Sequence, residues 1–293
     1  FPGAMDHQLD QAAELLLSAD FPIIHAGSGV VHARAFEELE QLSELLQAMV
    51  TTSWGARGAI PESNSLMIPM IHIEANNMAR NEADVVLVLG SRLGETDWWG
   101  KAPYWKADQK VIQVDISPEI LGMNKPVELA ILADVKTFMR QLIEKLRERQ
   151  SGIKADRRAE KRERILREQD RHRKKLDKHL EDFSVPMNPA HVPAICQEVF
   201  PEGTIYVFDG GNSVIWSNFY TKIEEPGTVL STFKFGMLGA GVGQALGASA
   251  ARENQPVCCI IGDGAMGFHP QEIESAVRNH MQVIFVVMCD RQW

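Results

Sequence analysis

Hydrophobic and polar positions follow two kinds of pattern along the first half of the chain. Residues 9–17 and 35–49 carry leucines at the spacing of one helical face, which predicts two amphipathic helices. Around them lie short apolar runs that end in small or polar residues and predict strands: "FPIIHAGSG", "AMVTTS", "ADVVLVLGS" and "KVIQVDIS". Runs that are apolar on both faces and are separated by helices indicate a parallel sheet covered on both sides.

The second half repeats this alternation. The strand-like runs are "TIYVFDGGN", "TVLST", "PVCCIIGDG" and "VIFVVMCD", and helices are predicted at 213–220, in "GAGVGQALGASAAR" and at 270–279. The fold class that we predict is therefore α/β, with two doubly wound domains, each built on a parallel sheet. The chain stops directly after a strand, so we expect it to be part of a longer polypeptide.

A helix-forming and strongly charged segment separates the two halves. It has too few apolar positions for a full core face, and three prolines follow it, so we interpret it as an interdomain connector. We expect a first domain at residues 1–146, a charged helical connector at 147–185 and a second domain at 186–293, incomplete at its C-terminus.

Length and composition agree with this division. A chain of 293 residues is too long for one ordinary core, and 45% hydrophobic with 24% charged residues is typical of a globular protein. No apolar run is long enough for a membrane helix, and the first residues do not resemble a signal peptide. The four cysteines form no C-x-x-C pair, so we expect reduced thiols in a cytoplasmic protein.

The net charge of −9 is unevenly distributed. Residues 136–182 contain 17 Lys/Arg and 10 Asp/Glu, so this segment is basic while the rest of the chain is acidic. Because the acids interleave with the bases, as on a solvated helix with i,i+4 pairs, we do not expect nucleic-acid binding.

Two carboxylates follow apolar strands near the end of the chain. Asp263 lies between Gly262 and Gly264 after the run that starts at Val257, and Asp290 follows the run that starts at Val283. A helix joins the two predicted strands, and such a crossover brings both strand ends to one edge of the sheet. That edge is where open α/β sheets bind ligands, so we expect the two acids to converge there.

Two convergent carboxylates would repel each other unless a cation lies between them. Mg²⁺ prefers a few protein oxygens together with phosphate oxygens, and the glycines at 262 and 264 allow the backbone to approach a phosphate closely. The sequence contains no G-x-x-x-x-G-K-[ST] motif. It therefore predicts a Mg²⁺–diphosphate site built without a P-loop.

These residues resemble the signature of the thiamin diphosphate-dependent enzymes: G-D-G, a helix, an apolar strand and then an amide or acidic ligand. "DGGNSVIW" (209–216) and "GMLGAGVGQALGA" (236–248) resemble two further segments of that family. "LGSR" (89–92) and "VIQVDISPE" (111–119) resemble its middle, Rossmann-like domain. The resemblance covers nearly the whole chain, and it implies that domain followed by part of a thiamin diphosphate-binding fold.

The resemblance also assigns roles to residues. It implies that Mg²⁺ is bound by Asp263, Asp290 and the backbone carbonyl of Gln292. The positions expected to contact the cofactor are Asn212, Ser213, Gly262, Gly264, Ala265 and Met266. Leu238 matches the apolar wedge that keeps the cofactor bent, and the carbonyl of Gly236 or Met237 would accept a hydrogen bond from its amino group.

The implied activity is that of the acetolactate synthase, benzaldehyde lyase and 2-oxo acid decarboxylase group. We expect a carboligase similar to acetolactate synthase, acting on a 2-oxo acid or an aldehyde; a decarboxylase or lyase of the family is the alternative. Asp290 stands where the family usually has asparagine, and the family's activating glutamate lies on an N-terminal domain that this sequence does not contain. Since a partner subunit supplies that glutamate in the family, the resemblance implies a homodimer or tetramer and an inactive fragment.

Other interpretations stay open. Asp290 and the missing glutamate favour a non-catalytic nucleotide-binding or assembly subunit. The middle domain of relatives binds FAD, ADP or nothing, and Arg92 matches an arginine that often faces FAD. "HAGSGVVH" resembles a dinucleotide fingerprint, but His32 replaces its third glycine, which argues against an NAD site.

Several further side chains are better explained by structural roles than by catalysis or ligand binding. Trp98 and Trp99 could line a ligand site, but we expect them to be buried in a core or an interface. His25, His72 and His269 lie near predicted strand ends or in loops. Without a visible partner, we expect each of these histidines to be a hydrogen-bonded structural residue.

Overall fold

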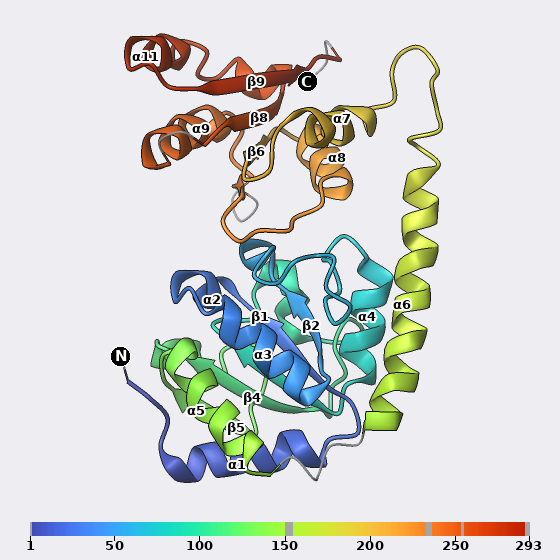
Figure 1. The fold of residues 1–293 in the computed structure, drawn as a ribbon, viewed down its shortest axis with the longest axis vertical. Helices are drawn as coiled ribbons and strands as arrows, with labels where there is room; N and C mark the ends of the chain where they lie inside the picture. Colours follow the sequence, from blue (N-terminus) through green and yellow to red (C-terminus); the bar gives the residue numbers. More distant parts are fainter. Residues whose placement is uncertain (1, 150–154, 233–235, 253–254, 291–293) are drawn as a thin grey trace. The chain divides into compact units, whose positions relative to one another are not determined.

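The computed structural model of the chain contains two compact units, residues 1–173 and residues 174–293. It describes residues 2–149, 155–232, 236–252 and 255–290 (Figure 1). Each unit has its own parallel sheet and its own hydrophobic clusters on that sheet. The predicted fold class, two doubly wound α/β domains, is confirmed.

The first unit is built on a five-stranded parallel sheet with the order β2-β1-β3-β4-β5. Its strands are β1 (Pro22–Ala26), β2 (Met49–Thr52), β3 (Val85–Leu89), β4 (Lys110–Asp115) and β5 (Leu129–Leu132). Every residue of β1, β2 and β3 is buried. Helices on both faces explain why these strands are continuous apolar runs instead of alternating patterns.

The helices of the first unit lie on both faces of this sheet (Figure 1). They are α1 (Asp6–Ser18), α2 (Ser28–His32), α3 (Phe36–Leu46), α4 (Ile73–Glu82), α5 (Val135–Arg147) and α6 (Ala155–Asp177). Short turns are η1 (Trp54–Ala56), η2 (Glu95–Gly100) and η3 (Pro118–Ile120). Ile24 and Leu87 pack in the cluster with α1, α3 and α5, whereas Ile23 and Val86 pack in the opposite cluster with α4 and α6.

The charged helix α6 is anchored to the first unit. Ile165, in the middle of the helix, is fully buried in the cluster beside α4, and Arg158, near its N-terminus, is fully buried as well. The Arg158 guanidinium donates to the carbonyls of Leu46, Leu16 and Ala19. These carbonyls belong to the last turns of α3 and α1, where helices have unsatisfied acceptors and partial negative charge. The boundary between the units falls within α6, and the domain limits 1–146, 147–185 and 186–293 stay a prediction.

The second unit has a four-stranded parallel sheet with the order β7-β6-β8-β9. The strands are β6 (Ile205–Asp209), β7 (Val229–Ser231), β8 (Val257–Gly262) and β9 (Val283–Met288). The helices are α7 (His191–Val199), α8 (Asn212–Tyr220), α9 (Ala240–Ala251), α10 (Asp263–Met266) and α11 (Glu272–Arg278). β8 is buried over nearly its full length, whereas the edge strand β9 leaves Ile284 52% and Val287 43% exposed.

Candidate functional site

The carboxyl ends of β8 and β9 lie side by side. The two strands are parallel, and their register pairs Gly262 with Met288. Asp263 directly follows β8, and Asp290 lies two residues after β9, so both acids extend from the same edge of the sheet. The Cys289 thiol donates to Asp263 Oδ2 at 3.3 Å, which links the two segments. The predicted topology of this edge is therefore present, while metal binding by the two acids stays a prediction.

Asp263 begins the short helix α10. Its Oδ1 accepts the backbone N–H of Gly264 at 2.9 Å, so the carboxylate is oriented by the loop that carries it. Asp263 is partly exposed and Asp290 is exposed, and an ion from solution can therefore reach both. Within the described residues no group of three His, Cys, Asp or Glu side chains could hold a metal. The predicted set contains two carboxylates and a carbonyl, and that carbonyl, of Gln292, lies outside the described residues.

The N-terminus of α8 lies next to this edge, because β6 pairs with β8. No side chain caps α8, and a Cβ added at Gly211 would meet nothing within 4 Å. Asn212 is exposed, while the Ser213 hydroxyl is buried and donates to the Asp209 carbonyl at 2.7 Å. Open space in front of uncapped first-turn N–H groups suits an anion such as a phosphate.

The two glycine-containing loops after β6 and β8 are in contact. A Cβ at Gly262 would lie 3.1 Å from Ser213 Oγ, and a Cβ at Gly210 would lie 3.2 Å from the Gly262 nitrogen. Gly210 also has φ of 106°, a backbone conformation that side chains other than glycine rarely adopt. The structure therefore brings Ser213 close to Gly262, the residue before Asp263, while ligand binding by these residues stays a prediction.

Asp209 has a role that the sequence interpretation missed. It is 2% exposed, and its two carboxylate oxygens accept the backbone N–H groups of Gly210 at 2.6 Å and Gly241 at 2.7 Å. The second bond ties the end of β6 to the first turn of α9. Only a glycine fits there, since a Cβ at position 241 would lie 2.5 Å from Asp209 Cβ. Two sequence features could have indicated this contact: the acid directly before Gly210 and Gly211, and the G-x-G at residues 239–241 at the start of α9.

The loop before α9 carries the residues predicted to hold the cofactor in its bent form. Leu238 packs partly against the cluster under α9, and Met237 is 54% exposed. The Met237 carbonyl accepts the Thr232 hydroxyl at 3.2 Å. Gly239 has φ of 88°, and a Cβ there would lie 2.5 Å from Phe268 Cβ, so this loop packs on the segment after α10.

The remaining predicted contact residues are less accessible. Ala265 is 3% exposed, and Met266 packs partly on the same cluster as Leu238. We expect these two positions to offer backbone groups to a ligand. Gly236 is exposed, and its N–H donates to the Thr232 carbonyl at 2.9 Å. The expected contact of the Gly236 carbonyl with a ligand stays a prediction.

The glycine turn after β1 packs against the chain instead of presenting its N–H groups. Gly27 N–H donates to Leu89 O at 2.8 Å, and Gly29 N–H donates to Gly90 O at 3.0 Å. Cβ atoms at Gly27 and Gly29 would lie 2.2 Å and 2.6 Å from atoms of Gly90. The two glycines therefore serve close loop packing, and the expectation that this turn is not an NAD site stays a prediction.

Two histidines of the first unit have structural partners, as expected. His25 Nδ1 is hydrogen-bonded to Thr51 Oγ1 at 3.0 Å, and His72 Nδ1 is 2.9 Å from Nδ1 of His172 on α6. Burial, then the proximity of His172 and nearby arginines, lowers the pKa of His72 to about 3, so His72 is neutral at physiological pH. His269 is exposed, and its expected structural role stays a prediction.

Of the two expected environments for Trp98 and Trp99, burial in a core is wrong, and burial in an interface stays a prediction. Their side chains are 41% and 44% exposed, although Trp98 stacks on Tyr104 with the ring centroids 4.0 Å apart. They belong to η2, whose backbone is kinked. The buried tryptophan of this region is Trp105, whose side chain is fully buried.

Comparison with known proteins agrees with this geometry. Residues 9–142 match the family model described as thiamine pyrophosphate enzyme, central domain. Residues 209–293 match the model described as thiamine pyrophosphate enzyme, C-terminal TPP binding domain. The chain therefore belongs to the thiamine pyrophosphate enzyme family and carries its central and C-terminal TPP-binding domains.

Individual relatives differ in their named activities. The chain is 31% identical to sulfoacetaldehyde acetyltransferase of Castellaniella defragrans, over 97% of this chain and 51% of that protein. It is 27% identical to the acetolactate synthase large subunit of Cyanidium caldarium (99% and 49%) and to 2-hydroxyacyl-CoA lyase of Arabidopsis thaliana (97% and 49%). The chain thus spans about half the length of the curated relatives that it matches.

Two further observations concern membrane helices and the cysteines. None of the helices in that part of the chain combines the length and apolarity that crossing a membrane requires. Cys196, Cys258, Cys259 and Cys289 are free thiols.

Proposed function

We propose that this chain is part of an enzyme that uses thiamin diphosphate and Mg²⁺ to form or cleave a carbon–carbon bond next to a carbonyl group. The observation that carries the proposal is the shared edge of β8 and β9, where Asp263 and the segment of Asp290 meet beside the uncapped start of α8. An anionic diphosphate and a cation need these opposite kinds of protein groups next to each other.

The residues present fit the cofactor. The open space at Gly211 and the first-turn amides of α8 would hold phosphate oxygens, and Asp263 and Asp290 would hold Mg²⁺. When bound, the cofactor supplies a nucleophilic carbon and then stores the electrons released at the substrate carbonyl. This chain's own contribution is to hold the diphosphate end, while Leu238 supports the cofactor from the α9 side.

The substrate class that we favour is a 2-oxo acid as donor, in a carboligation like that of an acetolactate synthase. Sulfoacetaldehyde acetyltransferases stand among the relatives at 31% identity, which makes an aldehyde substrate the second candidate. A lyase or decarboxylase is the third. A product assay of the full-length protein with pyruvate, with sulfoacetaldehyde and with a 2-hydroxyacyl-CoA separates the three.

We further propose a homodimer or tetramer in the cytoplasm, and FAD, ADP or no ligand in the central domain. The subunit proposal rests on family resemblance, and the free thiols support the compartment. Sedimentation of the full-length protein, with spectra of the bound chromophore, tests the assembly and the flavin together.

The decisive experiment is calorimetric titration of the full-length protein with thiamin diphosphate, with and without Mg²⁺. We expect binding that requires the metal and is lost in Asp263→Asn. Glu274→Gln is the matched control, since Glu274 is an exposed acid of the same unit that pairs with Arg278 at the surface. Absence of binding, or binding that ignores Mg²⁺, contradicts the proposal and favours a non-catalytic subunit.

A further inference from the structure

A strained turn follows β3 in the first unit. Trp98, Trp99 and Gly100 have φ of 55°, 50° and 63°, so three consecutive residues lie in the left-handed region. Residues with a Cβ rarely adopt this conformation, and two bulky neighbours require surrounding structure that imposes it. Both tryptophan side chains are over two-fifths exposed, so burial of their rings does not explain the turn.

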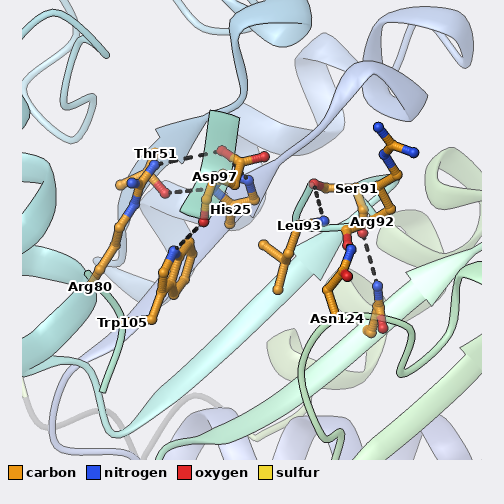
Figure 2. Close-up of polar contacts among 10 residues, drawn as sticks. His25, Thr51, Arg80, Ser91, Arg92, Leu93, Asp97, Trp105 and Asn124 are labelled. Atoms are coloured by element: carbon orange, nitrogen blue, oxygen red, sulfur yellow. Dashed lines mark hydrogen bonds and ion pairs between the residues drawn. The ribbon is translucent and has the colours of Figure 1, made fainter. Parts of the chain in front are cut away.

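A buried ionic cluster lies directly before the turn, at Asp97. This carboxylate is 3% exposed, and its Oδ1 is 3.5 Å from His25 Nε2 and 3.8 Å from Arg80 Nη2. His25 comes from β1 and Arg80 from α4, so three elements meet at Asp97 (Figure 2). None of the three facing atoms has a hydrogen-bond partner among the described residues.

The backbone of the turn is held at both ends. Trp105 Nε1 donates to the Asp97 carbonyl at 2.8 Å, and the Arg80 guanidinium lies 4.8 Å from the centre of the Trp105 ring (Figure 2). On the far side, Lys125 Nζ donates to the Gly100 carbonyl at 3.0 Å. The left-handed residues 98–100 thus lie between two hydrogen bonds from buried side chains, those of Trp105 and Lys125.

Stability alone is a weak reason for this cluster. Burial lowers the pKa of Arg80, and although burial by itself raises the pKa of Asp97, His25 and Arg80 hold it below its ordinary value. Charged groups in such surroundings lose hydration that their mutual attraction only partly replaces. Apolar residues of similar size would fill the space at lower cost, so a positional role is the better explanation.

We propose that Asp97, held between His25 and Arg80, is a latch that imposes the left-handed turn and keeps Trp98 and Trp99 in one preformed orientation at the surface. The turn lies at the carboxyl edge of the first sheet, where open α/β sheets offer their loops to ligands. The device belongs to the first unit and does not depend on the diphosphate site of the second.

Hydrogen exchange measured by mass spectrometry on the full-length protein tests the latch. In Asp97→Asn we expect amides 97–101 to exchange about tenfold faster while those of β1 and β3 are unchanged, since loss of the latch opens the turn locally. Trp105→Phe removes the indole hydrogen bond to the Asp97 carbonyl and reduces the buried ring that Arg80 and His25 contact, so it should act in the same direction. Glu95→Gln, an exposed acid of the same turn, is the control and should have no effect.

A further variant separates a latch from a general packing role. Asparagine tolerates the left-handed region, so Trp99→Asn added to Asp97→Asn should restore part of the lost protection. Unchanged exchange in both Asp97→Asn and Trp105→Phe overturns the proposal. Faster exchange spread evenly over the unit also overturns it, because the cluster would then be ordinary core. If Asp97→Asn does not fold, Trp105→Phe alone decides between these outcomes.

Discussion

Two aspartates at the ends of neighbouring strands have different roles because they differ in burial and in hydrogen bonding. Asp209 after β6 is enclosed, and both of its oxygens accept backbone N–H groups. Asp263 after β8 is partly exposed and accepts one N–H from its own loop and a thiol from Cys289. Asp209 therefore organises the loops, whereas Asp263 stands where a cation from solution can meet it.

Asp290→Asn tests the negative charge at the position that we propose as a second metal ligand. An additional negative charge near bound diphosphate costs about 1 kcal/mol at effective dielectric constants between those of water and protein. We expect Asp290→Asn to bind thiamin diphosphate about fivefold more tightly at saturating Mg²⁺, since 1 kcal/mol is close to that factor. Calorimetric titration measures it, and weaker binding in the variant would show that the second carboxylate is needed for the metal.

Arg158→Met tests the anchor of α6. The change leaves the carbonyls of Leu46, Leu16 and Ala19 without their buried donor, and each unsatisfied group is destabilising. We expect a loss of about 2–3 kcal/mol in the free energy of unfolding, partly offset because a buried charge is removed as well. Urea denaturation provides the measurement. Arg167→Met is the control, because Arg167 forms only an exposed i,i+4 pair with Glu163.

At the scale of elements, the contact between α9 and the end of β6 depends on a helix face without side chains. Gly241 lies against Asp209, and Gly243, two residues further along the same helix, faces open space. At Gly241 the helix approaches Asp209 at the end of β6 closely. This difference between two glycines of one helix makes the packing testable.

Gly241→Ala should be destabilising and Gly243→Ala should not. The added methyl at 241 meets Asp209 at 2.5 Å and must push α9 away from β6, for which we expect about 2 kcal/mol of lost stability. The same methyl at 243 meets no atom, and alanine favours the helix by up to about 1 kcal/mol. Thermal unfolding of both variants gives the comparison; equal effects would contradict this account of the contact.

The contact between His72, directly before α4, and His172 of α6 should make stability depend on pH. His72 is neutral in the folded unit, with a pKa lowered to about 3, but has an ordinary pKa of 6.5 when unfolded. As pH falls below 6.5, the unfolded state takes up a proton that the folded state does not, so stability decreases until about pH 3. The upper limit of this contribution is about 5 kcal/mol. His72→Gln should flatten the decline between pH 6.5 and 4 in urea denaturation, and an unchanged slope would contradict the prediction.

The sequence predicts the elements whose own periodicity is strong and misses those whose pattern depends on partners. Helices α1, α3, α8, α9 and α11 and most strands are predicted, because apolar or small residues mark most of them. Helix α4 was missed because its buried face consists of Ala75, Asn76, Ala79 and Arg80, which no hydropathy pattern marks. β5 was missed because only four residues form it and two of them are exposed.

The candidate site shows the same limit. The neighbourhood of Asp263 and Asp290 followed from the handedness of the strand–helix–strand crossover, which is a general rule of topology. The bond between Asp209 and Gly241 joins residues 32 positions apart, and the meeting of His25, Arg80 and Asp97 joins three separate elements. Local sequence patterns do not indicate contacts between residues so far apart in the chain, so only the structure shows them.

At the scale of the whole molecule, two units with separate sheets and hydrophobic clusters should respond separately to a ligand of one of them. A ligand at one hundred times its dissociation constant stabilises its binding unit by about 2.7 kcal/mol. We expect calorimetric unfolding of the full-length protein to show a transition that thiamin diphosphate with Mg²⁺ raises and EDTA lowers again. The transition of the first unit should stay unchanged; a uniform rise of all transitions would show that the units unfold together.

The outer edge of β9 has a practical consequence for anyone who produces these 293 residues by themselves. Within the described part of the chain, this strand has a hydrogen-bonded neighbour on one side only, and Ile284 and Val287 face water beside it. Backbone groups in that state recruit strands from other molecules and lead to precipitates or inclusion bodies. A lysine at position 287 would be a sensible first remedy for poor yield.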